Sequence, residues 1–206
     1  MENDIEDRIQ NPNPIPDIRE TSFNDGIFNL TFKSQNVRSL NVSTRNTLTT
    51  EKIYAITQSK EDIIFICDTR LNEEQQKPAI NDIKKKLFIL GYDIIVNSKT
   101  SLRGVCILYK KSLNLEVLDI LRDEDNNLIL CKFWQNNNIF IVGSIYGTND
   151  NNPLFFANLK NMIELLSGPN IQSIPIILGG DWNATIDNSN LESNIDVINM
   201  RNIPSR

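Results

Sequence analysis

The sequence mixes strand-like apolar runs with amphipathic helix-like segments, and this mixture limits the folds that it can adopt. Residues 62–67 are apolar at nearly every position, which predicts a strand buried on both faces. The runs at 128–135 and 139–145 are separated by Asn136-Asn137-Asn138, which predicts a hairpin. Buried and hairpin-like strands interspersed with helices favour two packed sheets with helices outside them.

The remaining elements follow from the same patterns of spacing. Further strands are expected at 27–37, 92–96, 104–109, 113–121 and from residue 174 to the Gly179-Gly180-Asp181 stretch. Helices are expected at 50–59, 78–90 and 153–166, with a short one from Leu191. Residues 1–24 are acidic and rich in proline, so we expect a flexible leader before a domain at 25–206.

The charge and composition of the 206-residue chain indicate a soluble globular protein. It is 40% hydrophobic and 23% charged, and no apolar run is long enough to span a bilayer. Residues 1–20 carry a net charge of −4 of the total −5, which leaves a nearly neutral body. The acidic start is not a signal peptide, and Asn183-Ala-Thr185 would be a glycosylation sequon in a secreted protein. We therefore expect an intracellular protein, nuclear or cytoplasmic, that does not bind membranes.

The absence of histidine restricts the chemistry of the chain. It excludes Ser-His-Asp and Cys-His catalysis and every metal site with a histidine ligand. The three cysteines, Cys67, Cys106 and Cys131, lie in apolar runs and are expected to be buried, reduced thiols. Carboxylates and amides remain as functional groups, and these suit Mg²⁺.

Polar side chains follow four of the expected strands. These are Asn36, Asp68, Tyr146 with Asn149, and Asp181 with Asn183. If the four strands point the same way, their polar ends form one oxygen-rich pocket in which Mg²⁺ can bind a phosphate. Each residue also has an ordinary structural interpretation, such as a turn, a cap or an exposed surface group, so the hypothesis rests on their order in the chain.

That order resembles the endonuclease/exonuclease/phosphatase superfamily over residues 28–185. The closest likeness is to the apurinic-type endonuclease domains of non-LTR retrotransposon polyproteins. The motifs are NVRSL at 36–40, CDTRL at 67–71, GVCIL at 104–108, IYGTN at 145–149 and GDWN at 180–183.

The resemblance implies a four-layer α/β/β/α sandwich of two mixed sheets that cleaves a phosphodiester with Mg²⁺, or with Mn²⁺ as the alternative ion. The implied substrate is DNA, nicked by a retroelement-type endonuclease with no small-molecule cofactor, and a reverse transcriptase would lie downstream in a longer parent protein. The implied roles are metal binding for Asp68 and Asn36, catalysis for Asp181, Asn183 and Tyr146, and substrate binding for Asn183, Asn149 and Arg70.

The sequence departs from the family pattern at three points. The metal acid is Asp68 where the family has Glu, and Tyr146-Gly147-Thr148 replaces Tyr-x-Pro. The Ser-Asp-His block that the family carries downstream is absent. We therefore expect a domain that is incomplete at its C-terminus, before its final strands, with weak or no activity, so its status as an enzyme stays open. The alternatives are a phosphoesterase of the same superfamily acting on lipid or inositol phosphates, and a catalytically inactive binding fragment.

Overall fold

The computed structural model describes residues 30–40, 46–73, 75–148, 152–170 and 174–183. The chain divides into two units, Met1–Leu30 and Thr31–Arg206. Every helix and strand given below belongs to the second unit. The predicted leader and the helix expected from Leu191 lie outside the described residues.

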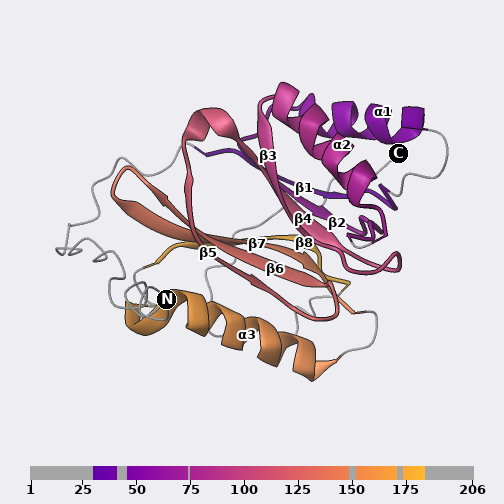
Figure 1. Cartoon of the computed structure of the whole chain (residues 1–206). Helices are drawn as coiled ribbons and strands as arrows, with labels where there is room; N and C mark the ends of the chain where they lie inside the picture. Colours follow the sequence, from indigo (N-terminus) through magenta and orange to yellow (C-terminus); the bar gives the residue numbers. More distant parts are fainter. Residues whose placement is uncertain (1–29, 41–45, 74, 149–151, 171–173, 184–206) are drawn as a thin grey trace, which may run out of the picture. The chain divides into compact units, whose positions relative to one another are not determined.

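Two four-stranded sheets form the centre of the second unit (Figure 1). The first has the order β1 (Phe32–Asn36), β2 (Ile63–Cys67), β4 (Val105–Lys110) and β3 (Tyr92–Asn97). The second has the order β5 (Glu116–Arg122), β6 (Leu128–Gln135), β7 (Asn138–Tyr146) and β8 (Ile176–Asp181). β1 pairs in parallel with β2, and β7 with β8, while the other neighbours are antiparallel. Both sheets are therefore mixed, as predicted.

Helices cover the outer faces of the two sheets (Figure 1). The helices α1 (Asn46–Thr57) and α2 (Lys77–Ile89) share an apolar cluster with β2 and β4 of the first sheet. The helix α3 (Pro153–Ser167) packs on β6 and β7 of the second. Short 3₁₀ turns lie at Lys111–Leu113 and Gly168–Asn170. The predicted four-layer α/β/β/α sandwich is thus confirmed, and none of the described helices is long and apolar enough to cross a membrane.

The buried strand and the hairpin both follow from the sequence. All five residues of β2 are buried, as a strand between two layers requires. Asn136 and Asn137 join β6 to β7 with φ angles of 49° and 66°. Asparagine tolerates this left-handed conformation, and a two-residue turn with both angles positive matches the twist of a hairpin. The three cysteines are buried and unpaired, as expected.

The predicted starts of three elements are wrong. The strand expected from residue 113 begins at Glu116, because Lys111–Leu113 form a 3₁₀ turn. The first strand begins at Phe32, so residues 30 and 31 of the expected strand are not part of it, and residues 27–29 lie outside the described residues. Phe32 is 37% exposed. β1 lies at the edge of its sheet and has a neighbouring strand on one flank only, so its side chains are less covered. The Phe32 ring stacks beside that of Phe65, with the ring centroids 6.1 Å apart. The first helix begins at Asn46, so Thr50 lies inside it rather than at its cap. Lys86 of α2 donates a hydrogen bond to the Thr50 hydroxyl, a tertiary contact that local pattern does not reveal.

The two sheets pack through close contacts at their centre. The Ser144 hydroxyl of β7 donates to the carbonyl of Ile66 in β2 at 3.0 Å. A Cβ atom on Gly179 of β8 would lie 2.1 Å from the Phe65 ring. The absence of a side chain at residue 179 therefore sets how closely β8 approaches β2.

Replacement of this glycine tests the inter-sheet packing. We expect Gly179→Ala to destabilise the fold by about 1–3 kcal/mol, because the added methyl displaces the buried Phe65 ring. The measurement is the midpoint concentration of urea-induced unfolding, compared between variants whose unfolding curves have the same slope. Ser34→Ala on the exposed side of β1 is the control and should leave the midpoint unchanged. An equal midpoint for Gly179→Ala would show that the sheets are not packed this tightly.

Candidate active site

Four strands bring the predicted polar residues to one edge of the sandwich. Asn36 ends β1 directly opposite Cys67, the last residue of β2. Tyr146 ends β7 directly opposite Asp181, the last residue of β8. Because both pairs are parallel, each places two carboxyl ends of strands side by side, as the sequence hypothesis required.

A side-chain hydrogen bond joins the two sheets at this edge. The Asn36 Nδ2 group donates to Asp181 Oδ2 at 3.0 Å. The backbone N–H of Asn183 donates to the other oxygen of Asp181 at 3.2 Å. The Asn36 side chain is itself oriented, since its Oδ1 atom accepts from the backbone N–H of Arg38 at 3.1 Å. Both oxygens of Asp181 are therefore held by donors from different parts of the chain.

Asn183 is held against the end of β7. Its Nδ2 group donates to the carbonyl of Gly147 at 2.8 Å, and the Gly147 N–H donates to the carbonyl of Asp181 at 2.7 Å. A Cβ atom at Gly147 would lie 1.9 Å from the carbonyl oxygen of Trp182. Glycine therefore allows the two loops to approach, and the second N–H of the Asn183 amide remains for a ligand.

Asp68 forms an ion pair with Arg70 in the segment that follows β2. Asp68 is 3% exposed, and its carboxylate accepts two hydrogen bonds from the guanidinium, at 2.8 and 3.1 Å. The two φ angles, 58° and 52°, lie in the left-handed region, which brings side chains two positions apart into contact. The hydrogen bonds and charge of Asp68 raise the pKa of Arg70, whose side chain is 48% exposed.

The protonation of Tyr146 and Cys67 follows from their surroundings. Burial raises the pKa of Tyr146, the charges of Asp68 and Asp181 raise it further, and Arg103 opposes them. Burial raises the pKa of the Cys67 thiol to about 12. At neutral pH the phenol is thus a neutral hydrogen-bond donor, and the thiol is not available as a thiolate nucleophile.

Arg103 belongs to the site although the sequence analysis did not select it. Its Nη1 group donates to Asn127 Oδ1 at 3.1 Å, and the Asn127 carbonyl accepts from the backbone N–H of Tyr146 at 2.8 Å. The Arg103 carbonyl also accepts from the backbone N–H of Arg70. The one signal in the sequence was its place before Gly104, at the start of a motif that the resemblance already included.

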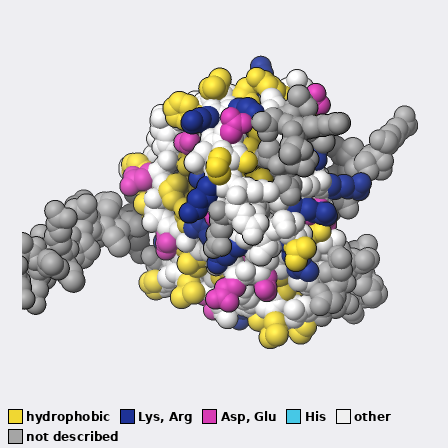
Figure 2. All heavy atoms as spheres, turned by 45° about the vertical axis from the view of Figure 1, so that its right-hand side comes forward, with side chains coloured by type: hydrophobic (Ala, Val, Ile, Leu, Met, Phe, Trp, Pro, Cys, Tyr) yellow, Lys and Arg dark blue, Asp and Glu magenta, His cyan; other side chains and the backbone are white. Residues whose placement is uncertain are grey.

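Positive side chains accompany the site. Arg38 follows β1, Arg70 contacts Asp68, and Arg103 lies beside Tyr146. Lys and Arg side chains also gather on the face of the molecule shown in Figure 2, among scattered acidic side chains. A local cationic region of this kind suits an anionic ligand even though the chain is acidic overall.

The donor set at this edge is compatible with a hard divalent cation. It comprises the carboxylates of Asp68 and Asp181 and the carboxamide of Asn36, and no three acidic or thiol side chains in the described ranges are arranged so that they could hold a metal ion together. Mg²⁺ is typically held by one or two carboxylates, with water and substrate phosphate as its other ligands. Each carboxylate oxygen has a second lone pair, so the bonds to Arg70 and Asn36 leave acceptor capacity on both acids.

The structure therefore brings together five of the predicted residues: Asn36, Asp68, Tyr146, Asp181 and Asn183. Arg70, predicted to bind substrate, contacts Asp68 instead of standing free. Asn149 lies outside the described residues. The catalytic, metal-binding and substrate-binding roles of these residues stay predictions.

Comparison with solved structures identifies the fold. A D. rerio TDP2 humanized by 14 mutations superposes with a TM-score of 0.52 at 16% identity, covering 76% of this chain and 63% of that one. TDP2 from C. elegans gives 0.50 at 15% identity, covering 76% and 48%. The endonuclease domain of TRAS1, a telomere-specific non-LTR retrotransposon, gives 0.47 at 15% identity, covering 76% and 60%.

The two TDP2 structures have a fold of the endonuclease/exonuclease/phosphatase type, and the α/β sandwich of this chain has the same type of fold. No protein-family model matches the sequence, and no curated protein matches it either. The chain spans 63% of the length of the first of these structures. At this level of identity the likeness establishes the fold, and the function has to be argued from the site.

Removal of Arg70 tests how its charge affects the acidic pocket. We expect Arg70→Ala to raise the affinity for Mn²⁺ by about tenfold, because the cation no longer competes with a guanidinium for Asp68. Calorimetry measures this without reference to activity. Arg38→Ala removes the same charge from the neighbouring loop without breaking an ion pair to Asp68 and is the matched control. Equal gains in both variants would mean that only net charge matters, and a loss for Arg70→Ala would mean that Arg70 positions Asp68.

The raised pKa of Tyr146 predicts a pH effect on stability. A phenol whose folded pKa lies above its unfolded value of about 10 stabilises the fold below that pH, and this contribution is lost as pH rises through the folded pKa. We expect thermal stability to fall more steeply above pH 10 in the wild type than in Tyr146→Phe. Tyr54→Phe removes a half-exposed phenol on α1 and controls for the loss of one tyrosine. Parallel profiles for the wild type and Tyr146→Phe would contradict the prediction.

Proposed function

We propose that this chain is a phosphodiester-cleaving domain that nicks DNA in the presence of Mg²⁺. The observation that supports it most directly is the hydrogen bond between Asn36 and Asp181, which joins the polar ends of both sheets into one site. Asp68, Tyr146 and Asn183 lie around that bond. Four separate segments of sequence thus supply an acid pair, amides and a phenol to one edge.

Asp181 is the residue that we propose orients the attacking water. Its two oxygens are fixed by Asn36 and by the backbone of Asn183, so the remaining lone pairs point in defined directions. A carboxylate held in this way can accept a hydrogen bond from water and take its proton as the phosphorus is attacked. The chain has no histidine, so no imidazole can perform this step.

Tyr146 and Asn183 are the groups that we propose bind the phosphate. The Tyr146 phenol stays neutral because of burial and the two nearby acids, so it donates rather than repels. One amide N–H of Asn183 donates to the carbonyl of Gly147, and the other can donate to a phosphate oxygen. Donors that are already oriented stabilise developing negative charge without reorganisation.

Asp68 and Asn36 are the residues that we propose hold the metal, with Mn²⁺ as an alternative to Mg²⁺. When bound, such an ion neutralises charge on the phosphate and polarises it for attack. Asp68 is one methylene shorter than glutamate, and the left-handed backbone at residues 68 and 70 determines where its carboxylate lies. Its bonds to Arg70 imply that the guanidinium shifts when the ion enters.

The series of sequence motifs supports DNA as the substrate and a retroelement protein as the parent. In such a parent a reverse transcriptase would follow this domain. The positive side chains at residues 38, 70 and 103 supply a local surface for a nucleic-acid backbone. Because the overall charge is −5, we expect non-specific affinity to be modest and to fall steeply with salt.

A second candidate function is DNA binding without cleavage. It is favoured by the ion pair of Asp68 with Arg70, which already neutralises the acid that would hold a metal. An arginine in this place can satisfy the buried carboxylate permanently, and the site would then bind phosphate through its donors alone.

A plasmid-nicking assay separates the two candidates. We expect the 206-residue chain to nick supercoiled DNA weakly with Mg²⁺, and Asp181→Asn to reduce that rate by about 10²–10³-fold, because the amide cannot accept a proton from water. The matched control is Asp82→Asn on α2, which makes the same change at an exposed ion pair.

The outcomes distinguish the candidates as follows. Nicking that EDTA abolishes and that Asp82→Asn retains would support hydrolysis at this site. DNA binding without nicking, unaffected by EDTA, would support the binding domain and reject the enzyme. Nicking that survives Asp181→Asn would place the activity elsewhere in the preparation.

A further inference from the structure

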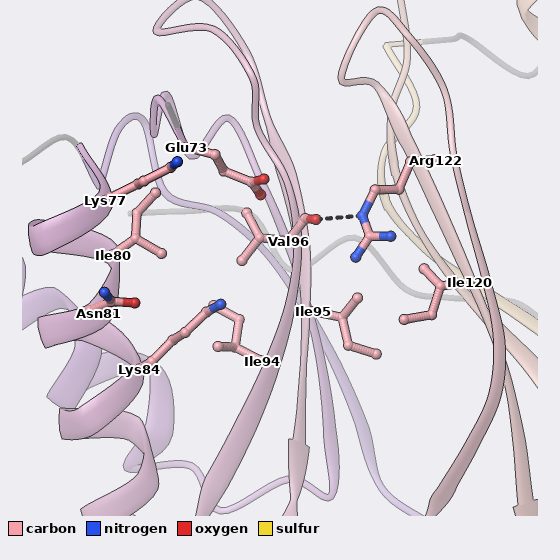
Figure 3. A pocket seen from close by; sticks show the side chains of 10 residues that line it. All are labelled: Glu73, Lys77, Ile80, Asn81, Lys84, Ile94, Ile95, Val96, Ile120 and Arg122. Atoms are coloured by element: carbon pink, nitrogen blue, oxygen red, sulfur yellow. Dashed lines mark hydrogen bonds between the residues drawn. The ribbon is translucent and has the colours of Figure 1, made fainter. Parts of the chain in front are cut away.

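A groove of about 540 Å³ lies between α2, β3 and β5, away from the residues of the candidate active site (Figure 3). Its floor is aliphatic and includes Ile80 of α2, Ile94 and Ile95 of β3, and Ile120 of β5. In Figure 3 the two sides of the groove face each other across β3, with helix on one side and strand on the other. β3 and β5 each lie at one edge of their sheets, so the groove follows two sheet edges.

The edge of β3 presents backbone groups to this groove. The backbone N–H of Lys110 donates to the carbonyl of Asp62, which lies on the side of β2. The backbone N–H and C=O of Lys110 therefore point away from β3. Tyr92 of β3 lies opposite Lys110, so its backbone N–H and C=O point away from β4. Because these groups alternate along a strand, those of Ile94 and Val96 also point away from β4. The Val96 carbonyl agrees with this, because it accepts a hydrogen bond from Arg122 at 2.8 Å.

Ile94 is then an unpaired edge position in the middle of the groove. Its backbone N–H and C=O point to the open edge, and within the part of the chain that the structure describes they form no hydrogen bond there. An edge with unpaired backbone groups and an aliphatic floor is a template for an added strand.

The rim of the groove is positively charged. Lys77 and Lys84 project from α2, and Arg122 projects from β5 on the opposite side (Figure 3). Neither lysine has an ion-pair partner among the described residues, and Glu73 is the one acid in the lining. The rim is therefore complementary to acidic side chains.

We propose that this groove binds an extended acidic peptide, which adds to β3 as a further strand. Its backbone would pair with Ile94, its apolar side chains would cover the isoleucine floor, and its Asp or Glu side chains would meet Lys77, Lys84 and Arg122. A single-stranded nucleic acid fits less well, because the lining has no aromatic side chain on which a base could stack. The Arg122 bond to Val96 closes the edge at one end and so sets where the added strand stops.

Fluorescence anisotropy with defined peptides tests this proposal on the full chain. The probe is a labelled peptide of alternating Glu and Ile residues. The comparison peptides are the same sequence with every backbone amide N-methylated, which cannot donate a backbone hydrogen bond from either edge, and a version with Lys in place of Glu. We expect saturable binding of the first peptide and no binding of the other two.

Charge variants locate the site. Lys84→Gln combined with Arg122→Gln should weaken binding roughly tenfold, since two exposed ion pairs are lost. Lys85→Gln combined with Lys160→Gln removes the same charge outside the groove and should have no effect. All four positions are exposed, and circular dichroism confirms that the variants are folded.

Several results would overturn the proposal. Equal binding of the N-methylated peptide would exclude strand addition, and equal loss in both double variants would exclude the groove. Binding of oligothymidylate in place of the peptide, with the same dependence on Lys84 and Arg122, would assign the groove to nucleic acid. Self-association lost in the Lys84→Gln and Arg122→Gln variant would assign it to a second copy of the chain. None of these outcomes depends on whether the chain cleaves phosphodiesters.

Discussion

The parallel pairing of β1 with β2 and of β7 with β8 is the constraint on which the site depends. Parallel neighbours end at the same edge, so a polar residue at the end of each strand necessarily joins the others. The bond between Asn36 and Asp181 then links residues 145 positions apart and fixes the two sheets at that edge. If either pair were antiparallel, the polar residues at the end of one of its strands would lie at the opposite end of the sandwich.

The sequence alone predicts the elements in which the pattern of apolar residues matches the pattern of burial. Every residue of β2 is apolar and buried, and the Asn-rich turn between β6 and β7 matches a hairpin, so local physics and tertiary structure agree there. The exposure of Phe32 could not be predicted, because an apolar residue on an edge strand has the same pattern as one in the interior. Edge position depends on which strands pair, and no local signal carries that information.

For the site, the sequence located the residues but not their partners. Asn36, Tyr146 and Asp181 lie where strand ends predict, because the end of a strand is a property of local pattern. The ion pair of Asp68 with Arg70 depends on two left-handed φ angles that non-glycine residues rarely adopt, so nothing in the sequence announced it. Arg103 reaches the site through Asn127, which accepts from its guanidinium and from the backbone N–H of Tyr146. These contacts join segments that are distant in the sequence, so no local pattern predicts them.

The same loops connect the candidate site to the edge of β3. Ser98, just beyond β3, accepts a hydrogen bond from the Thr69 hydroxyl, and Thr69 lies between Asp68 and Arg70. The Ser98 carbonyl accepts from the N–H of Glu73, which lines the groove. The segment that shapes the acidic pocket is thus held by the strand whose outer edge is free.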